Sequence, residues 1–172
     1  IYTIPISLVY TSTFQNILQI FDYKVILPNV NVTSENGFKI LKEVIAKRLN
    51  TNLLTEEALE EVIKKSGGVM RELIGMVRTA CVEAIVNDQD IITLDTIKKV
   101  VNERKNDFKR ILIREQQYTA LKLVHEKKDL DIRADEEIVN QIPDLLYNLS
   151  ILEYNDSVWW DVHPVVLDLL EK

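Results

Sequence analysis

The chain has 172 residues, and its 47% hydrophobic and 28% charged content is ordinary for a globular protein. One cysteine excludes an internal disulfide framework, and no apolar run approaches the roughly 20 residues of a membrane-spanning helix. The net charge is −6, but residues 129–172 alone hold 11 acidic and 2 basic side chains. We therefore expect a cytoplasmic protein without a membrane segment, whose last third is a poor electrostatic match for nucleic acid.

Residues 1–32 predict a strand, a short helix and an extended segment. β-Branched and aromatic types dominate residues 1–10, which indicates a buried strand that ends at Pro5 or lies at a sheet edge. A short helix is expected within residues 11–21, where apolar residues recur at helical spacing. These apolar residues are Phe14, Ile17, Leu18 and Phe21. Residues 24–32 contain a proline and should be extended.

Residues 33–112 follow the 3.6-residue hydrophobic period of four amphipathic helices. The expected helix starts lie near Ser34, Thr55, Val69 and Thr93. Two consecutive glycines at 67–68 should end the second helix. In the third helix, six side chains are expected to face the core: Leu73, Ile74, Val77, Cys81, Ala84 and Ile85.

Residues 113–172 predict a helix over 114–127 and a second helix over 135–148 that Pro143 breaks or kinks. Two β-like runs, ILEY and VWWDV, follow, with an Asn-Asp-Ser turn between them. Helix, helix and hairpin form the outline of a winged helix-turn-helix. The predicted fold class is therefore mainly α, a four-helix bundle followed by a winged helix. The predicted domains are 1–32, 33–112 and 113–172.

The most distinctive motif is Ser-Gly-Gly-Val-Met-Arg-Glu-Leu at residues 66–73. Gly67 and Gly68 permit a tight turn, after which Arg71 lies in the first turn of the third helix. Arginine suits a phosphate because its planar guanidinium donates two parallel hydrogen bonds and keeps its charge. Arg78 follows seven residues later, about two helical turns on, and so is expected on the same face.

A helical bundle in which Gly-Gly-x-x-Arg opens the third helix resembles the lid of AAA+ P-loop ATPases. The resemblance implies that Arg71 is the sensor 2 residue, which contacts the γ-phosphate of the nucleotide. It makes Gly67, Gly68 and Arg78 further candidate nucleotide-binding residues.

The segments around this motif extend the resemblance over nearly the whole chain. Residues 1–10 are similar to the sensor 1 strand of the α/β ATPase core, with Thr3 or Ser7 as the candidate polar sensor. The following VILPNVNV run resembles the stretch that links core to lid. The order of core tail, lid and winged helix looks most like the origin-initiator branch of AAA+ proteins. Some signal-transducing STAND-type ATPases share this layout.

The catalytic motifs of such ATPases are absent from these residues. The chain has neither a Gly-rich phosphate loop with its Lys-Ser/Thr nor the acidic pair that holds magnesium. The resemblance implies that ATP and Mg²⁺ bind mainly to an upstream core, in a parent chain that is an ATPase. We expect no activity from this segment alone and no metal site, because His125 and His163 lack metal-ligand spacing.

Other functions remain open at the level of sequence. Arg71 also fits a surface arginine that follows a helix C-cap, as in a helical adaptor without a nucleotide. A DNA-binding winged-helix regulator supported by a helical bundle is a further alternative. Residues 135–149 hold four acids and no base, and DNA affinity depends largely on Lys and Arg, so DNA is disfavoured. Besides the upstream core, we expect a protein partner or self-association through the winged helix.

Overall fold

The computed structural model describes residues 3–11, 14, 16, 19–20, 23, 25–154 and 158–170. The described residues are mainly helical, with a small antiparallel sheet, as the sequence predicts. Among them, no helix is both long and apolar enough to cross a bilayer. The chain divides into two compact units. The hairpin unit comprises 1–28 and 112–162, and the bundle unit comprises 29–111 and 163–172.

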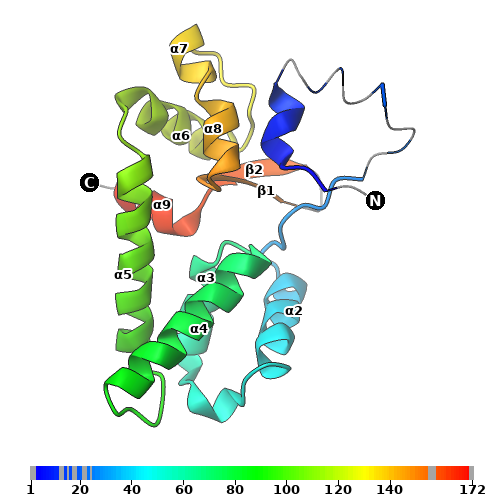
Figure 1. Cartoon of the computed structure of the whole chain (residues 1–172). Helices are drawn as coiled ribbons and strands as arrows, with labels where there is room; N and C mark the ends of the chain where they lie inside the picture. Colours follow the sequence, from blue (N-terminus) through cyan, green and yellow to red (C-terminus); the bar gives the residue numbers. More distant parts are fainter. Residues whose placement is uncertain are drawn as a thin grey trace. The chain divides into compact units, whose positions relative to one another are not determined.

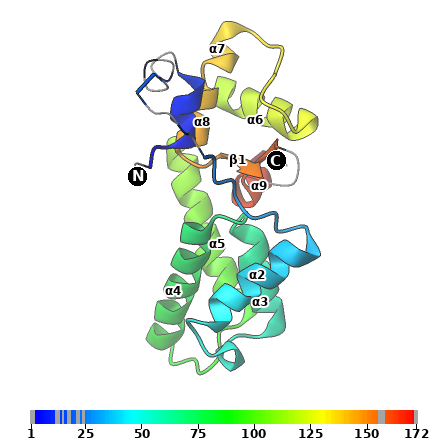
Figure 2. The ribbon, with the colours of Figure 1, turned by 90° about the vertical axis from the view of Figure 1, so that its right-hand side faces the viewer.

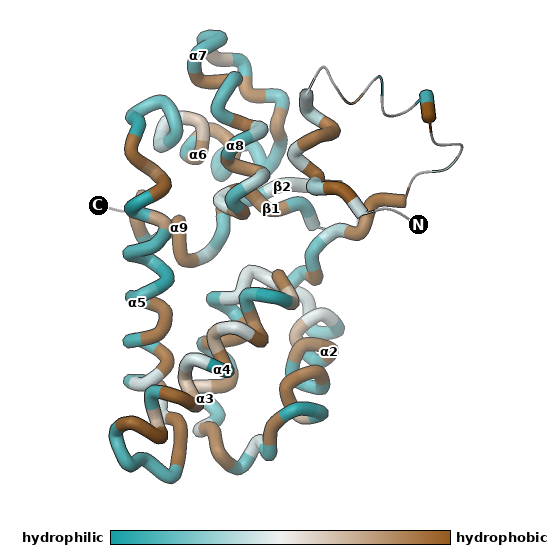
Figure 3. The backbone as a smooth tube through the Cα atoms, viewed as in Figure 1, coloured by the Kyte–Doolittle hydropathy of each residue, from teal (hydrophilic) through white to brown (hydrophobic). Residues whose placement is uncertain are grey.

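The bundle unit is built around one central helix. Its elements are α2 (Glu35–Ala46), the 3₁₀ helix η2 (Thr51–Leu53), α3 (Glu56–Lys65), α4 (Met70–Val86), α5 (Leu94–Ile111) and α9 (Pro164–Leu170). Helix α3 packs against α2, α4, α5 and α9, and its Leu59, Val62 and Ile63 are buried (Figures 1 and 2). Hydrophobic and hydrophilic stretches alternate along α2 and α5, as expected of helices with one buried face (Figure 3).

The predicted helix starts at Ser34 and Thr55 are confirmed by their capping contacts. The backbone N–H of Gly37 donates to Ser34 Oγ at 3.0 Å, and that of Ala58 donates to Thr55 Oγ1 at 3.2 Å. Two glutamates follow Thr55 in the first turn of α3, where the helix dipole favours negative charge. Local sequence chemistry thus fixes where α2 and α3 begin.

The buried face of α4 differs from the prediction, because Met76 and Ala80 are buried in addition to the predicted Leu73 and Ala84. Ile85, expected to face the core, is 74% exposed. Helix α4 packs on α3 and α5. Ile85 lies about 100° from Ala84 around the helix axis, so it is outside the buried face. The other predicted residues, Ile74, Val77 and Cys81, are half-buried.

The hairpin unit combines short helices with the two-stranded sheet. Its elements are the 3₁₀ helix η1 (Ile6–Tyr10), α6 (Glu115–Lys127), α7 (Glu136–Val139), α8 (Ile142–Tyr147), β1 (Ile151–Tyr154) and β2 (Trp159–Val162). The strands are antiparallel, with Ile151 opposite Val162 and Glu153 opposite Trp160. Helix α6 packs on α7 and β2, and α8 packs on η1 and β1. The predicted turn at 155–157 lies outside the described residues.

The predicted strand over residues 1–10 is wrong for its described part. Ile6–Tyr10 forms η1, and the N–H of Leu8 donates to the Pro5 carbonyl at 3.1 Å. Proline has no N–H for a strand ladder, and no strand within the described residues pairs with this segment, so local bonds satisfy the backbone. Of the helix predicted within residues 11–21, Phe14 and Asn16 are helical, and Ile17, Leu18 and Phe21 lie outside the described residues.

The helix predicted over 135–148 is two helices. Helix α7 ends at Val139 and α8 begins at Ile142, so the break precedes Pro143. A proline ring clashes with the carbonyl four residues earlier in a helix, which is that of Val139. The sequence located the interruption within a few residues because this clash is local.

The last helix, α9, belongs to the bundle unit. Asp168 lies 2.8 Å from the ammonium of Lys65 on α3 and 3.8 Å from that of Lys105 on α5. His163 is fully buried at the N-cap of α9, where its Nδ1 accepts the N–H of Val165 at 3.2 Å. Its ring packs on Phe108 with a centroid distance of 5.1 Å. These contacts fix both ends of the short helix to α3 and α5.

Burial makes His163 a source of pH dependence. Desolvation, followed by the positive charges of Arg104 and Lys65, lowers the pKa of His163 from 6.5 to about 3. Below about pH 6.5 the unfolded chain takes up a proton at this position and the folded chain does not. The contribution of the neutral His163 ring to the free energy of unfolding is therefore complete above pH 6.5, the pKa in the unfolded chain. It is lost as the pH falls toward about 3, the pKa in the folded chain.

We expect His163→Asn, which keeps a cap acceptor for Val165, to remove this part of the pH dependence. The wild type should be more stable at neutral pH, because the variant loses ring packing. That advantage should shrink by about 1.4 kcal/mol per pH unit on acidification below about pH 6. Urea unfolding of both proteins at several pH values measures it. Parallel stability curves for the two proteins would contradict the role assigned to His163.

Candidate functional site

The turn between α3 and α4 is internally bonded and strongly bent. Ser66 is fully buried, its hydroxyl donates to the carbonyl of Ile63 at 2.7 Å, and the N–H of Gly68 donates back to Ser66 Oγ at 3.2 Å. Gly67 has a φ of 60° and Gly68 a φ of 76°, both in the left-handed region that favours glycine. The two glycines thus end α3 and reverse the chain into α4, as predicted.

Gly68 also makes a close backbone contact. A β-carbon on Gly68 would lie 1.7 Å from the carbonyl oxygen of Val30, and the N–H of Val30 donates to the Gly68 carbonyl at 3.3 Å. The segment that enters the bundle unit is therefore bonded to the α3–α4 turn. This contact gives Gly68 a steric requirement of its own, separate from any ligand.

Arg71 lies in the first turn of α4, where the sequence placed it, and it is exposed. Among the described residues it has no ion pair and no hydrogen-bond partner for its guanidinium. Its neighbour Glu72 is already paired, since it accepts two hydrogen bonds from Arg104 at 2.7 and 2.9 Å. Arg104 in turn lies 4.5 Å from the ring centroid of Phe108. Arg71 therefore remains available to a group outside the bundle unit.

An open groove of about 340 Å³ runs between α4 and α5 beside Arg71. Its lining residues are Arg71, Glu72, Gly75, Met76, Thr79, Val100, Glu103, Arg104 and Asp107. Three carboxylates face two guanidinium groups, and that of Arg104 is neutralised by Glu72. The groove by itself is a poor anion site. A phosphate would meet Arg71 favourably only at the open rim, away from these acids.

Gly75 lies one helical turn after Arg71 and lines the same groove. A β-carbon added to Gly75 would meet no atom within 4 Å. Glycine in a helix interior is less favourable than alanine by about 0.5–1 kcal/mol, and no internal packing explains it here. The missing side chain of Gly75 leaves open space beside Arg71 on the surface of α4.

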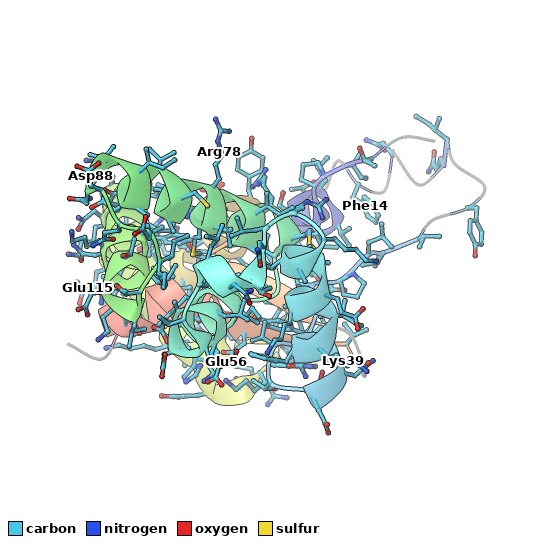
Figure 4. All side chains as sticks on the ribbon, turned by 90° about the horizontal axis from the view of Figure 1, so that it is seen from below. Phe14, Lys39, Glu56, Arg78, Asp88 and Glu115 are labelled. Carbon is cyan, nitrogen blue, oxygen red and sulfur yellow. The ribbon has the colours of Figure 1, made fainter. Side chains whose placement is uncertain are left out.

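Arg78 does not share a groove with Arg71. It extends outward from α4 (Figure 4) and lines a second groove, between α2 and α4, together with Arg48. Seven residues bring the two α4 arginines to nearly the same angle, but their side chains reach different neighbours. The structure thus separates Arg78 from the turn at Gly67 and Gly68. A nucleotide contact for Arg71, Arg78 or either glycine stays a prediction.

One polar cluster in the hairpin unit was not predicted from the sequence. His125 Nδ1 lies 2.7 Å from Asp161 Oδ1, and the Lys128 ammonium lies 2.6 Å from Asp161 Oδ2. The carbonyl of Lys128 also accepts the N–H of Trp160 at 3.1 Å. The cluster joins the end of α6 to β2. His125 and Asp161 are 36 residues apart in the sequence, so no local sequence pattern could predict their contact.

The strands bury a carboxyl group that the sequence did not single out. Glu153 on β1 is buried, and desolvation raises its pKa, although the indole of Trp160, opposite Glu153 in the sheet, partly offsets this shift. Trp159 instead stacks on Tyr154 at a centroid distance of 4.5 Å. The two adjacent tryptophans therefore serve different contacts within the hairpin unit. Within the described residues, no cluster of three His, Cys, Asp or Glu side chains could hold a metal.

Comparison with known proteins finds no protein-family model and no curated protein that matches this chain. The strongest candidate is the Gly67–Arg71 turn, which combines a fixed backbone with an exposed guanidinium that has no partner in the described part of the chain.

Gly68 and Gly75 form a matched pair for testing the turn. Gly68→Ala should destabilise the bundle unit by at least about 2 kcal/mol, because alanine disfavours this φ and its β-carbon overlaps the Val30 carbonyl. Gly75→Ala should stabilise it by about 0.5–1 kcal/mol through helix propensity. Urea unfolding at one pH and temperature measures both. Equal effects of the two substitutions would show that the turn is not held as described.

Proposed function

We propose that this chain is the nucleotide-sensing lid and winged-helix module of an AAA+ P-loop ATPase, with a regulatory and protein-interaction role. In this proposal, ATP and Mg²⁺ bind to an upstream core, and Arg71 serves as the sensor 2 arginine. The observation that carries the proposal is the unpaired guanidinium of Arg71 directly after the glycine turn. Helices α2–α5 would be the lid, and the hairpin unit from α6 to β2 would be the winged helix.

The proposed mechanism is differential contact with the γ-phosphate. The contact between Gly68 and Val30 holds the start of α4, so Arg71 would be presented on a rigid element. A hydrogen bond to a charged group contributes about 1.5–3 kcal/mol, or roughly a 10- to 100-fold preference for ATP over ADP. A nucleotide shifts an equilibrium between arrangements only through such a difference in affinity. Hydrolysis would remove the contact and release the lid.

The winged helix would bind protein rather than DNA. Asp135, Glu136 and Glu137 at α7 and Asp144 on α8 are all exposed. None of these carboxylates has an ion-pair partner in the described part of the chain. Duplex DNA would be repelled by such a surface, because binding requires cations that neutralise phosphates. The helix–helix–hairpin outline is the one feature that favours the alternative, a DNA-binding regulator.

Arg71→Ala in the complete ATP-binding protein is the direct test. It should weaken ATP binding roughly 10- to 100-fold while leaving ADP binding unchanged, because only ATP carries the γ-phosphate. Arg133→Ala, which removes an exposed arginine of the hairpin unit, is the matched control and should change neither affinity. Isothermal titration with both nucleotides measures the ratio. An unchanged ATP-to-ADP ratio in folded Arg71→Ala protein would reject the sensor assignment.

A further inference from the structure

The groove between α2 and α4 has an apolar floor and a basic rim. Its volume is about 180 Å³, and its lining residues are Val44, Ile45, Arg48, Leu49, Ile74, Val77, Arg78 and Cys81. Helix α2 packs on α3, and α3 packs on α4, which leaves aliphatic side chains of α2 and α4 only half-buried along the groove. Such a partly exposed apolar surface gains stability when another group covers it.

The charge of this groove specifies what would cover it. Its lining within the described part of the chain contains no acidic residue. Arg48 donates only to the carbonyl of Val44 on its own helix, at 3.5 Å, and Arg78 has no partner within the described residues. Two exposed guanidinium groups beside an aliphatic floor are complementary to an aliphatic side chain flanked by carboxylates.

A segment with this chemistry is present at α7. Glu136 is exposed and precedes Val139 by three residues of α7, so these two side chains share one face, and the exposed Asp135 is the N-cap directly before them. Val139 is itself 39% exposed, and neither carboxylate has an ion pair among the described residues. The segment therefore presents one aliphatic group and two uncompensated negative charges.

We propose that α7 of one copy of this chain docks into the α2–α4 groove of a second copy. Val139 would enter the apolar floor, and Asp135 and Glu136 would face Arg48 and Arg78. The two surfaces differ, so the contact is heterologous and can continue from copy to copy. The proposal refines the interaction role proposed for the hairpin unit, on which it rests, and requires neither Arg71 nor a nucleotide.

Charge exchange tests both surfaces at once. Sedimentation velocity of the 172-residue chain should show association that grows with concentration and weakens with salt. Arg48→Glu with Arg78→Glu should weaken it by about tenfold or more, as should Asp135→Lys with Glu136→Lys. Neither double variant should associate alone, but an equimolar mixture should, because each acidic surface then meets a basic one. A control, Lys98→Glu with Lys109→Glu, alters charge elsewhere and should leave association unchanged.

Cys81 provides an independent measure of groove occupancy. It is the single cysteine of the chain and lines the groove, so a thiol reagent reports on this place alone. Its reaction rate should fall as the wild-type concentration rises, and should not fall for either double variant. Circular dichroism would show that both variants are folded, as would an unchanged Cys81 rate at high dilution for Asp135→Lys with Glu136→Lys. For the groove variant each rate is compared with its own value at high dilution, because carboxylates beside Cys81 slow the thiolate reaction.

Several results would overturn the proposal. They are a wild-type chain that is monomeric at every concentration, association that survives both double variants, and a mixture that fails to associate. Protection of Cys81 that does not depend on concentration would place the occupant within the same chain instead. None of these results affects the ATP-to-ADP ratio of Arg71→Ala, so the sensor assignment stands or falls separately.

Discussion

The bundle unit depends on one close approach, in which the Val30 carbonyl occupies the space that a β-carbon on Gly68 would need. The contact joins the entering segment to the turn that ends α3 and begins α4. Because α3 packs on α2, α4, α5 and α9, its end is also a fixed point for the rest of the unit. The direction of α4, and hence the place of Arg71, follows from this contact. Only glycine provides both the space and the left-handed backbone.

The charged residues divide into those that hold the fold and those that remain free. Glu72 with Arg104, and Asp168 with Lys65, are partly buried pairs that connect helices of the bundle unit. Arg71 and Arg78 are exposed and without such partners among the described residues. A free charge beside a groove can interact with an incoming group without first breaking an internal pair. For this reason the functional proposals concern the free residues, and the paired ones explain why the surfaces around them are rigid.

Local chemistry made much of the secondary structure predictable. The hydroxyls of Ser34 and Thr55 cap α2 and α3, and the glycine pair ends α3, so boundaries set by neighbouring residues were found. Prediction failed where the outcome depends on distant residues. Residues 3–10 have strand-like composition, but Ile6–Tyr10 forms η1 because no strand in the described residues pairs with this segment. Ile85 fits the helical period approximately, yet α3 and α5 cover only the line through Ala84.

The sequence by itself determined that this chain is mainly helical and that Arg71 begins a helix after a glycine turn. Hydrophobic period and capping are properties of residues a few positions apart, so they can be read without the fold. Only the tertiary structure decided that Glu72 is paired while Arg71 has no partner among the described residues, and that Arg78 lines the α2–α4 groove. The packing of His163 on Phe108 and the contact between His125 and Asp161 were likewise decided by the tertiary structure. These outcomes depend on contacts between helices and strands far apart in the chain, which no local pattern specifies.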